Sequence, residues 1–89
     1  MAWTVKFSDR ALRQLDRLDA VVQRRINRFL EQRLAKLRDP RQLGTALAGD
    51  LSGLWRYRVG DYRILCEFKN NELVVLVVAV GHRRDIYDS

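Results

Sequence analysis

The chain has 89 residues, with 17 Lys and Arg against 11 Asp and Glu, and a formal net charge of +6. This length fits one domain, which we expect to span residues 1–89. The charge favours nucleic acid, an acidic protein or an anionic membrane surface as partner, and leaves a merely soluble cationic domain as the alternative. The longest apolar run, residues 73–80, is too short to cross a bilayer. The first residues do not read as a signal peptide, so the expected location is the cytoplasm.

The one cysteine, Cys66, falls on the inward face of a predicted strand. There it is expected to pack as a small apolar residue. No group of Cys and His residues has metal-ligand spacing, so we expect neither a structural zinc site nor a cofactor.

Strand and helix periodicities follow one another in the first half of the chain. Alternating apolar residues predict a short strand over residues 2–7. Ser8 is a favourable N-cap for a first helix, and Asp19 for a second. Asp39-Pro40 ends the second helix, because proline disfavours helical backbone in the residue before it. The apolar stripe of this second helix consists of Val22, Ile26, Phe29, Leu30, Leu34 and Leu37.

The other side of the second helix is strongly polar. It carries Arg24, Arg25, Arg28, Glu31, Gln32 and Lys36. A solvated surface is the simplest interpretation, and contact with nucleic acid or an acidic partner is the alternative.

Two runs with period-two alternation, residues 54–59 and 62–68, flank a Gly-Asp pair at 60–61. This pattern predicts a β-hairpin with a two-residue type II′ turn. The turn sets the register and places Arg58 directly opposite Arg63. Like charges in that relation destabilise a sheet.

The opposed arginines have two interpretations. Their side chains either splay into solvent or reach a carboxylate such as Glu67, or an anion lies between them. Arginine is well suited to bind phosphate through two parallel hydrogen bonds. Arg56 shares the face of Arg58 and Arg63, which makes this face a candidate anion site.

Residues 73–80 form a run without a polar side chain, which is typical of an interior strand. A two-residue turn at 70–71 would place Arg63 opposite Val78. It would also turn Ala79 toward the core.

These elements predict an α+β fold in the order β-α-α-β-β-β, with an N-terminal αα-hairpin on one face of a mainly antiparallel four-stranded sheet. Residues 41–53 contain three glycines and predict a loop, with one helical turn around Thr45–Leu47. We expect the sheet to pack on the helices through Trp3, Val5, Phe7, Trp55, Tyr57, Ile64, Cys66, Val75 and Val77.

The chain resembles the RelE/ParE superfamily of bacterial and archaeal toxins. The resemblance covers essentially the whole chain and is most specific at two motifs, Leu-Trp-Arg-Tyr-Arg-Val-Gly-Asp-Tyr-Arg-Ile-Leu at 54–65 and Gly-His-Arg-Arg-Asp-Ile-Tyr at 81–87. It implies a type II toxin that a cognate antitoxin masks. RelE-like members cut mRNA in the ribosomal A site without a metal and so inhibit translation. ParE-like members inhibit DNA gyrase and lack the basic catalytic set.

The resemblance also implies site residues. RelE-like toxins use two basic residues before the tight turn, an arginine after it, an arginine after the last strand and a terminal tyrosine. These roles match Arg56, Arg58, Arg63, Arg83 and Tyr87. The filled set favours a ribosome-dependent endoribonuclease. Ribonuclease members often have lysine in the strand pair, and arginine stays protonated, so the general base is not identified.

Arg58, Arg63 and Arg83 are the expected phosphate clamp, since alignment and charge stabilisation supply most of the acceleration in such a reaction. Arg56 and Arg84 are further candidate RNA contacts. Tyr87 is expected to stack on a base or to donate a hydrogen bond, and the alternative is a surface aromatic that ties down the tail.

His82 is the one side chain with an ordinary pKa near neutrality, which makes it a candidate acid or base. A structural role is the alternative. If the last strand stays regular, His82 and Arg84 share the basic face and Arg83 does not. Gly81 is able to break that parity.

Two other functions remain open from the sequence. One is a ParE-like gyrase inhibitor, and the other is a module that binds nucleic acid without cutting it. In each toxin case we expect an acidic antitoxin segment over the arginine face or the αα-hairpin.

Overall fold

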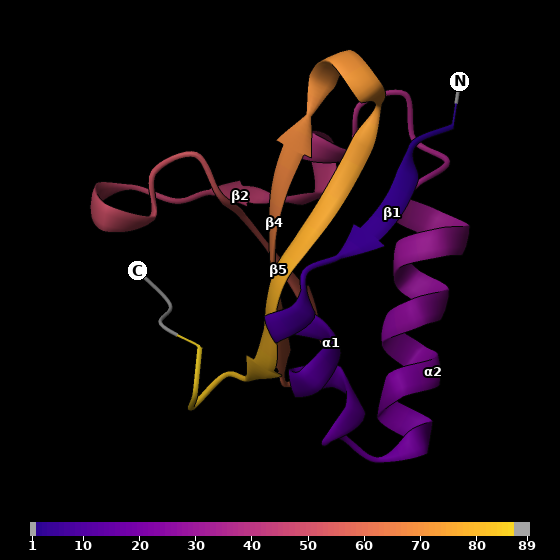
Figure 1. Ribbon diagram of the computed structural model, residues 1–89, viewed down its shortest axis with the longest axis vertical. Coiled ribbons are helices and arrows are strands. Elements are labelled where there is room, and N and C mark those ends of the chain that lie inside the picture. Colours follow the sequence, from indigo (N-terminus) through magenta and orange to yellow (C-terminus); the bar gives the residue numbers. More distant parts are fainter. Residues whose placement is uncertain (1, 87–89) are drawn as a thin grey trace.

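The computed structural model describes residues 2–86 and shows a five-stranded sheet with two helices on one face (Figure 1). The elements are β1 (Thr4–Phe7), α1 (Asp9–Asp16), α2 (Ala20–Arg28), β2 (Thr45–Ala46), β3 (Trp55–Val59), β4 (Tyr62–Lys69) and β5 (Val74–His82). The strands lie in the order β1-β5-β4-β3-β2. Only β1 and β5 pair in parallel, so the predicted α+β class and the interior position of β5 are confirmed.

The fifth strand, β2, was not predicted. Thr45 and Ala46 pair with Arg56 and Trp55 where a helical turn was expected, and that expectation is wrong. Short 3₁₀ turns at Pro40–Leu43 and Gly49–Leu51 lie on either side of β2. The pairing gives hydrogen-bond partners to part of the edge of β3, which would otherwise be open.

The helices begin where the sequence predicted. Ser8 caps α1, because its Oγ accepts a hydrogen bond from the Ala11 N–H at 3.1 Å. Asp19 takes the extended backbone of an N-cap at α2, without a side-chain cap bond in the described residues. No helix within residues 2–86 is long and apolar enough to cross a membrane.

The second helix changes its winding after α2. Residues Phe29–Leu34 form a π-helix, here η1, and the Ala35 N–H donates to the Leu30 carbonyl at 2.9 Å. Spacings of four along the chain do not distinguish this winding from an α-helix, so it was not predicted. The π-turn keeps Leu30 and Leu34 fully buried beside Ile26.

The β3–β4 hairpin has the predicted register. Val59 pairs with Tyr62 and Arg58 with Arg63. Gly60 has φ +59°, the positive value that a type II′ turn requires at this position.

The β4–β5 register differs from the prediction. A 3₁₀ turn at Asn70–Glu72 followed by Leu73 in left-handed backbone replaces the expected two-residue turn. Leu65 then pairs with Ala79 and Cys66 with Val77, so Val78 is an extra residue on β5. This bulge reverses the faces of the strand's last residues.

The core between sheet and helices contains every residue predicted for it except Ala79. Trp3, Tyr57, Ile64, Cys66, Val75 and Val77 are buried there, and Val5, Phe7 and Trp55 pack against them. Ala79 is the exception, since the bulge turns it to the outer face beside Leu65, and its predicted core position is wrong.

Candidate active site

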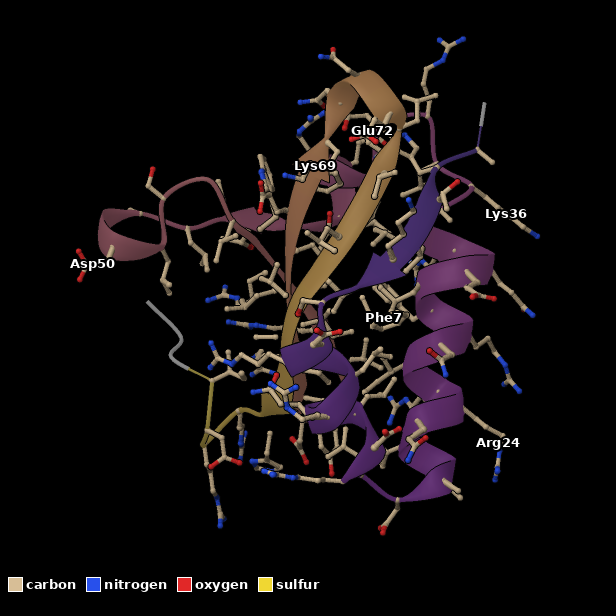
Figure 2. All side chains as sticks on the ribbon, in the orientation of Figure 1. Phe7, Arg24, Lys36, Asp50, Lys69 and Glu72 are labelled. Carbon is tan, nitrogen blue, oxygen red and sulfur yellow. The ribbon has the colours of Figure 1, made fainter. Side chains whose placement is uncertain are left out.

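Three arginines project from the face of the sheet that lies away from the helices. Arg56 and Arg58 on β3 and Arg63 on β4 alternate with Tyr57 and Ile64, which are buried in the helix-side core. The predicted basic face therefore exists, and we call Arg56, Arg58 and Arg63 the arginine face. Figure 2 shows nitrogen-tipped side chains on this side of the sheet.

The three guanidinium groups differ in exposure. Arg56 and Arg63 are each 8% exposed, whereas Arg58 is exposed. Nη1 of Arg63 donates to the carbonyls of Gly60 and Tyr62, each at 3.3 Å. Burial of a charged group needs such partners, and they fix where the group points.

An apolar cluster lies on the same face as these charges. It consists of Leu47, Leu65, Ala79 and Ile86, with Leu51, Leu54 and Val78 at its margin. Apolar surroundings lower the local dielectric response, so charges beside them act more strongly on a bound anion than charges in water.

Arg83 lies at the end of the sheet that carries the β3–β4 turn. Its N–H donates to the Asp61 carbonyl at 2.8 Å, and its Nη1 lies 3.9 Å from Oδ1 of Asp61. Both side chains are more than half exposed, so this ion pair contributes little stability. The structure thus brings Arg83 to the β3–β4 turn, which joins the strand of Arg58 to the strand of Arg63.

Gly81 explains how the segment after β5 folds back onto this face. Gly81 pairs with Arg63, and a Cβ built on Gly81 would lie 3.0 Å from Cγ1 of Ile86. The missing side chain leaves room for Ile86. The carbonyl of His82 accepts from the N–H groups of Asp85 and Ile86, which closes the turn.

His82 lies on the opposite, helix-side face. Its strand partner is Tyr62, and the two rings meet edge to face with centroids 5.5 Å apart. Both residues border a cavity with Gln14 of α1 and with Arg17, which follows that helix. His82 is therefore not brought together with the arginine face, because the Val78 bulge changes the parity of β5.

Arg84 and Tyr87 are the remaining candidate site residues. Arg84 is exposed, and its N–H donates to Nδ1 of His82 at 3.2 Å, which assigns the ring proton to Nε2. Tyr87 lies outside the described residues. Glu67, the carboxylate considered for the arginines, pairs with Nζ of Lys69 at 2.9 Å near the β4–β5 turn (Figure 2).

Comparison with known proteins decides the family. Residues 5–87 match the family model for the ParE toxin of type II toxin–antitoxin systems, parDE. The chain is a type II toxin of this family. It is 32% identical over 87 residues to Toxin RelG of Mycobacterium tuberculosis, with 98% of each chain covered.

Solved structures agree with this assignment. The RelBE2 toxin–antitoxin complex from Mycobacterium tuberculosis matches with a TM-score of 0.85 and 29% identity, covering 96% of this chain and 95% of that chain. The archaeal RelE–RelB complex from Pyrococcus horikoshii matches with a TM-score of 0.71 and 26% identity, covering 97% and 100%. The toxin therefore belongs to the RelE/ParE superfamily, as its motifs indicated, and it has a RelE-like fold.

Two buried groups of the toxin have strongly shifted pKa values. Burial raises the pKa of the Cys66 thiol, and burial also raises the pKa of the Tyr57 hydroxyl. Tyr57 Oη donates to the Pro40 carbonyl at 2.8 Å, so its proton is held in place. Neither group lies on the arginine face, and both are protonated at neutral pH.

Arg25 and Arg28 were predicted to lie on a solvated helix surface, with contact to nucleic acid or an acidic partner as the alternative. In the toxin they border, together with Arg33, a groove that reaches Arg58. The spacing of Arg25, Arg28 and Arg33 places them on one side of the helix, so the sequence alone could have predicted a basic stripe there. The groove itself depends on where the β3–β4 turn meets α2, and no sequence pattern gives that contact.

Proposed function

We propose that the toxin is a metal-independent endoribonuclease that cuts mRNA in the ribosomal A site and so inhibits translation. The proposal is carried by one observation: Arg58, Arg63 and Arg83 gather at the β3–β4 turn, on or beside a face with an apolar floor. Membership of a family with RelE-named relatives supports it. Its partners would be the ribosome and mRNA, and its location the cytoplasm.

The proposed chemistry begins with the ribose 2′-hydroxyl, which attacks the adjacent phosphorus and expels the 5′ oxygen. Negative charge grows on the phosphate in the transition state. Arg58, Arg63 and Arg83 would hold that phosphate, and fixed charges next to apolar surface stabilise such charge without reorganisation. Two carbonyls hold the Arg63 guanidinium in place.

The reaction also needs a proton to leave the 2′-hydroxyl and a proton to reach the 5′ oxygen. Arginine stays protonated, so the arginine face supplies alignment and electrostatics, and no general base. We assign His82 to holding the segment that carries Arg83, through the bond from the Arg84 N–H. Arg56 and Arg84 are proposed RNA contacts, and Tyr87 a proposed stacking or hydrogen-bonding residue.

We also propose a cognate antitoxin as partner. The RelBE2 and archaeal RelE–RelB structures contain toxin–antitoxin complexes. An acidic antitoxin segment over the arginine face would neutralise part of the net charge of +6 and mask the site.

Primer extension on translated mRNA after induction tests the function. The wild-type toxin is expected to leave cuts within codons of translated messages. Arg63→Ala and Arg83→Ala are each expected to lower cleavage about 100-fold or more, because each removes a group that stabilises transition-state charge. Arg24→Ala, an exposed arginine on α2, is the control and keeps wild-type cleavage.

The second candidate is a ParE-like inhibitor of DNA gyrase, which the name of the matching family favours. It predicts intact messages and accumulated gyrase–DNA breaks after induction. That result would contradict the ribonuclease proposal, whereas cleaved messages without such breaks would exclude the gyrase candidate.

A further inference from the structure

A second basic site lies on the other side of the β3–β4 turn. A groove of about 460 Å³ runs between the second helix and the turn end of β3. Its lining includes Arg25 and Arg28 of α2, and Phe29, Gln32 and Arg33 of η1. We call this the helix groove.

The helix groove concentrates positive charge from the second helix. No carboxylate lines it, and in the described part of the chain no acidic side chain forms an ion pair with Arg25, Arg28 or Arg33. Arg25 reaches across to the turn, since a Cβ built on Gly60 would lie 2.8 Å from its Nη1. Like charges that line one groove repel, and an anion between them would relieve the repulsion.

The groove is continuous with the arginine face. Arg58 lines the groove and also stands opposite Arg63 on the sheet. β2 pairs only as far as Arg56, so the turn end of β3 remains an edge next to α2 and η1. A polyanion held at Arg58 and Arg63 would therefore continue over this edge into the groove.

The chemistry of the groove fits nucleic acid better than an acidic peptide. Arginine forks match phosphate oxygens, and three such side chains along one helix side suit a backbone with regularly spaced charges. The one apolar side chain from the helix is Phe29, which is half-buried and packs on Tyr57 with centroids 6.0 Å apart. A docked amphipathic peptide would need a wider apolar floor.

We propose that the helix groove binds the phosphate backbone of the RNA strand that flanks the bond cut at the arginine face. This inference rests on the proposed ribonuclease function. It assigns Arg25 and Arg33 to substrate binding and gives the toxin a path for RNA that reaches from the outer face of the sheet to its second helix.

Binding of a short single-stranded 2′-O-methyl RNA by the full chain tests the inference, with fluorescence anisotropy as readout. The probe lacks a free 2′-hydroxyl and so is bound without being cut. Arg25→Ala and Arg33→Ala are each expected to weaken binding about tenfold, as loss of a charged hydrogen bond does. Each is also expected to reduce the slope of log K against log salt by about 0.7.

Arg24→Ala is the matched control. Arg24 stands next to Arg25 in α2, is likewise exposed, and points into solvent from the helix in Figure 2. The same charge is lost, so a general electrostatic effect would appear in both variants. The inference requires a much smaller change, within about twofold, for Arg24→Ala than for Arg25→Ala.

The outcomes separate this inference from the function on which it rests. If the wild type cuts messages but Arg25→Ala and Arg33→Ala bind the probe like wild type, the helix groove is not an RNA site. If Arg25→Ala and Arg33→Ala bind the RNA probe with wild-type affinity but lose affinity for the cognate antitoxin, the groove binds protein and the inference is again overturned. If the wild type cuts no message and both variants bind the RNA probe more weakly, the helix groove is an RNA-binding site and the ribonuclease proposal is wrong.

Discussion

Arg58 and Arg63 carry the same charge on one face of the sheet but differ in exposure. Arg63 is 8% exposed and donates to two turn carbonyls, whereas Arg58 is exposed. A guanidinium with several donors is able to bind these carbonyls and still present a fork to a phosphate. Position, and not charge alone, therefore distinguishes the two arginines.

Lysine substitutions test this difference. Arg63→Lys keeps the charge but lacks the guanidinium group, whose several donors are able to bind the turn carbonyls and a phosphate at once. We therefore expect cleavage to fall at least about tenfold. Arg58→Lys is expected to lose less, because an exposed ammonium still neutralises a phosphate. Single-turnover cleavage of ribosome-bound message measures both. Equal losses would show that the turn carbonyls do not position Arg63.

The Arg58–Arg63 pair was predictable because a two-residue turn at Gly60 leaves one register for the hairpin. The side of the sheet that His82 takes was not. It depends on the extra residue Val78, and a run of apolar residues such as 73–80 has no alternation to reveal a bulge.

At the scale of elements, a close contact helps to hold the turn after β5. Ile86 packs over Gly81, with Cγ1 and Cδ1 3.0 and 3.2 Å from the position of a Cβ. Ile86 is 7% exposed and belongs to the outer apolar cluster. The contact places Arg83 beside the β3–β4 turn, so packing and the candidate site are linked through Gly81.

A double-mutant cycle measures this link. Gly81→Ala is expected to lower the free energy of unfolding by about 1–3 kcal/mol, since the new methyl group has no room against Ile86. In an Ile86→Ala background the same change is expected to cost clearly less, with a coupling of about 0.5–3 kcal/mol. Urea unfolding gives all four values. Additive changes would show that Ile86 does not restrict residue 81.

The elements themselves differ in how far the sequence predicts them. Ser8 and Asp19 begin helices as expected, because caps are local signals. β2 and η1 were missed, since the first depends on an open strand edge and the second on how Leu30 and Leu34 meet the sheet. Local patterns predict elements that local forces form, and tertiary contacts decide the rest.

Across the whole molecule, the core depends on two groups that are protonated in the fold. Cys66 is fully buried on β4, and Tyr57 is 1% exposed on the neighbouring strand β3. The Tyr57 hydroxyl donates a hydrogen bond to the Pro40 carbonyl. The Tyr57 ring packs on Gly44, where an added Cβ would lie 2.9 Å from Cζ of the ring. Tyr57 thus fastens the loop before β2 to the sheet.

These two groups predict a loss of stability at alkaline pH. Burial raises the pKa of Cys66 and of Tyr57, so the fold keeps protons that the unfolded chain releases. Their stabilisation is complete below the unfolded pKa values and falls as pH rises above them. The free energy of unfolding should drop by about 1.4 kcal/mol per pH unit above about pH 8.5 from Cys66, with Tyr57 adding an equal slope above about pH 10. Urea unfolding under reducing conditions measures the slope.

Cys66→Ala lowers stability at every pH through its cavity but should flatten the slope between about pH 8.5 and 10. An unchanged slope in that variant would show that the thiol is not the group that titrates on unfolding.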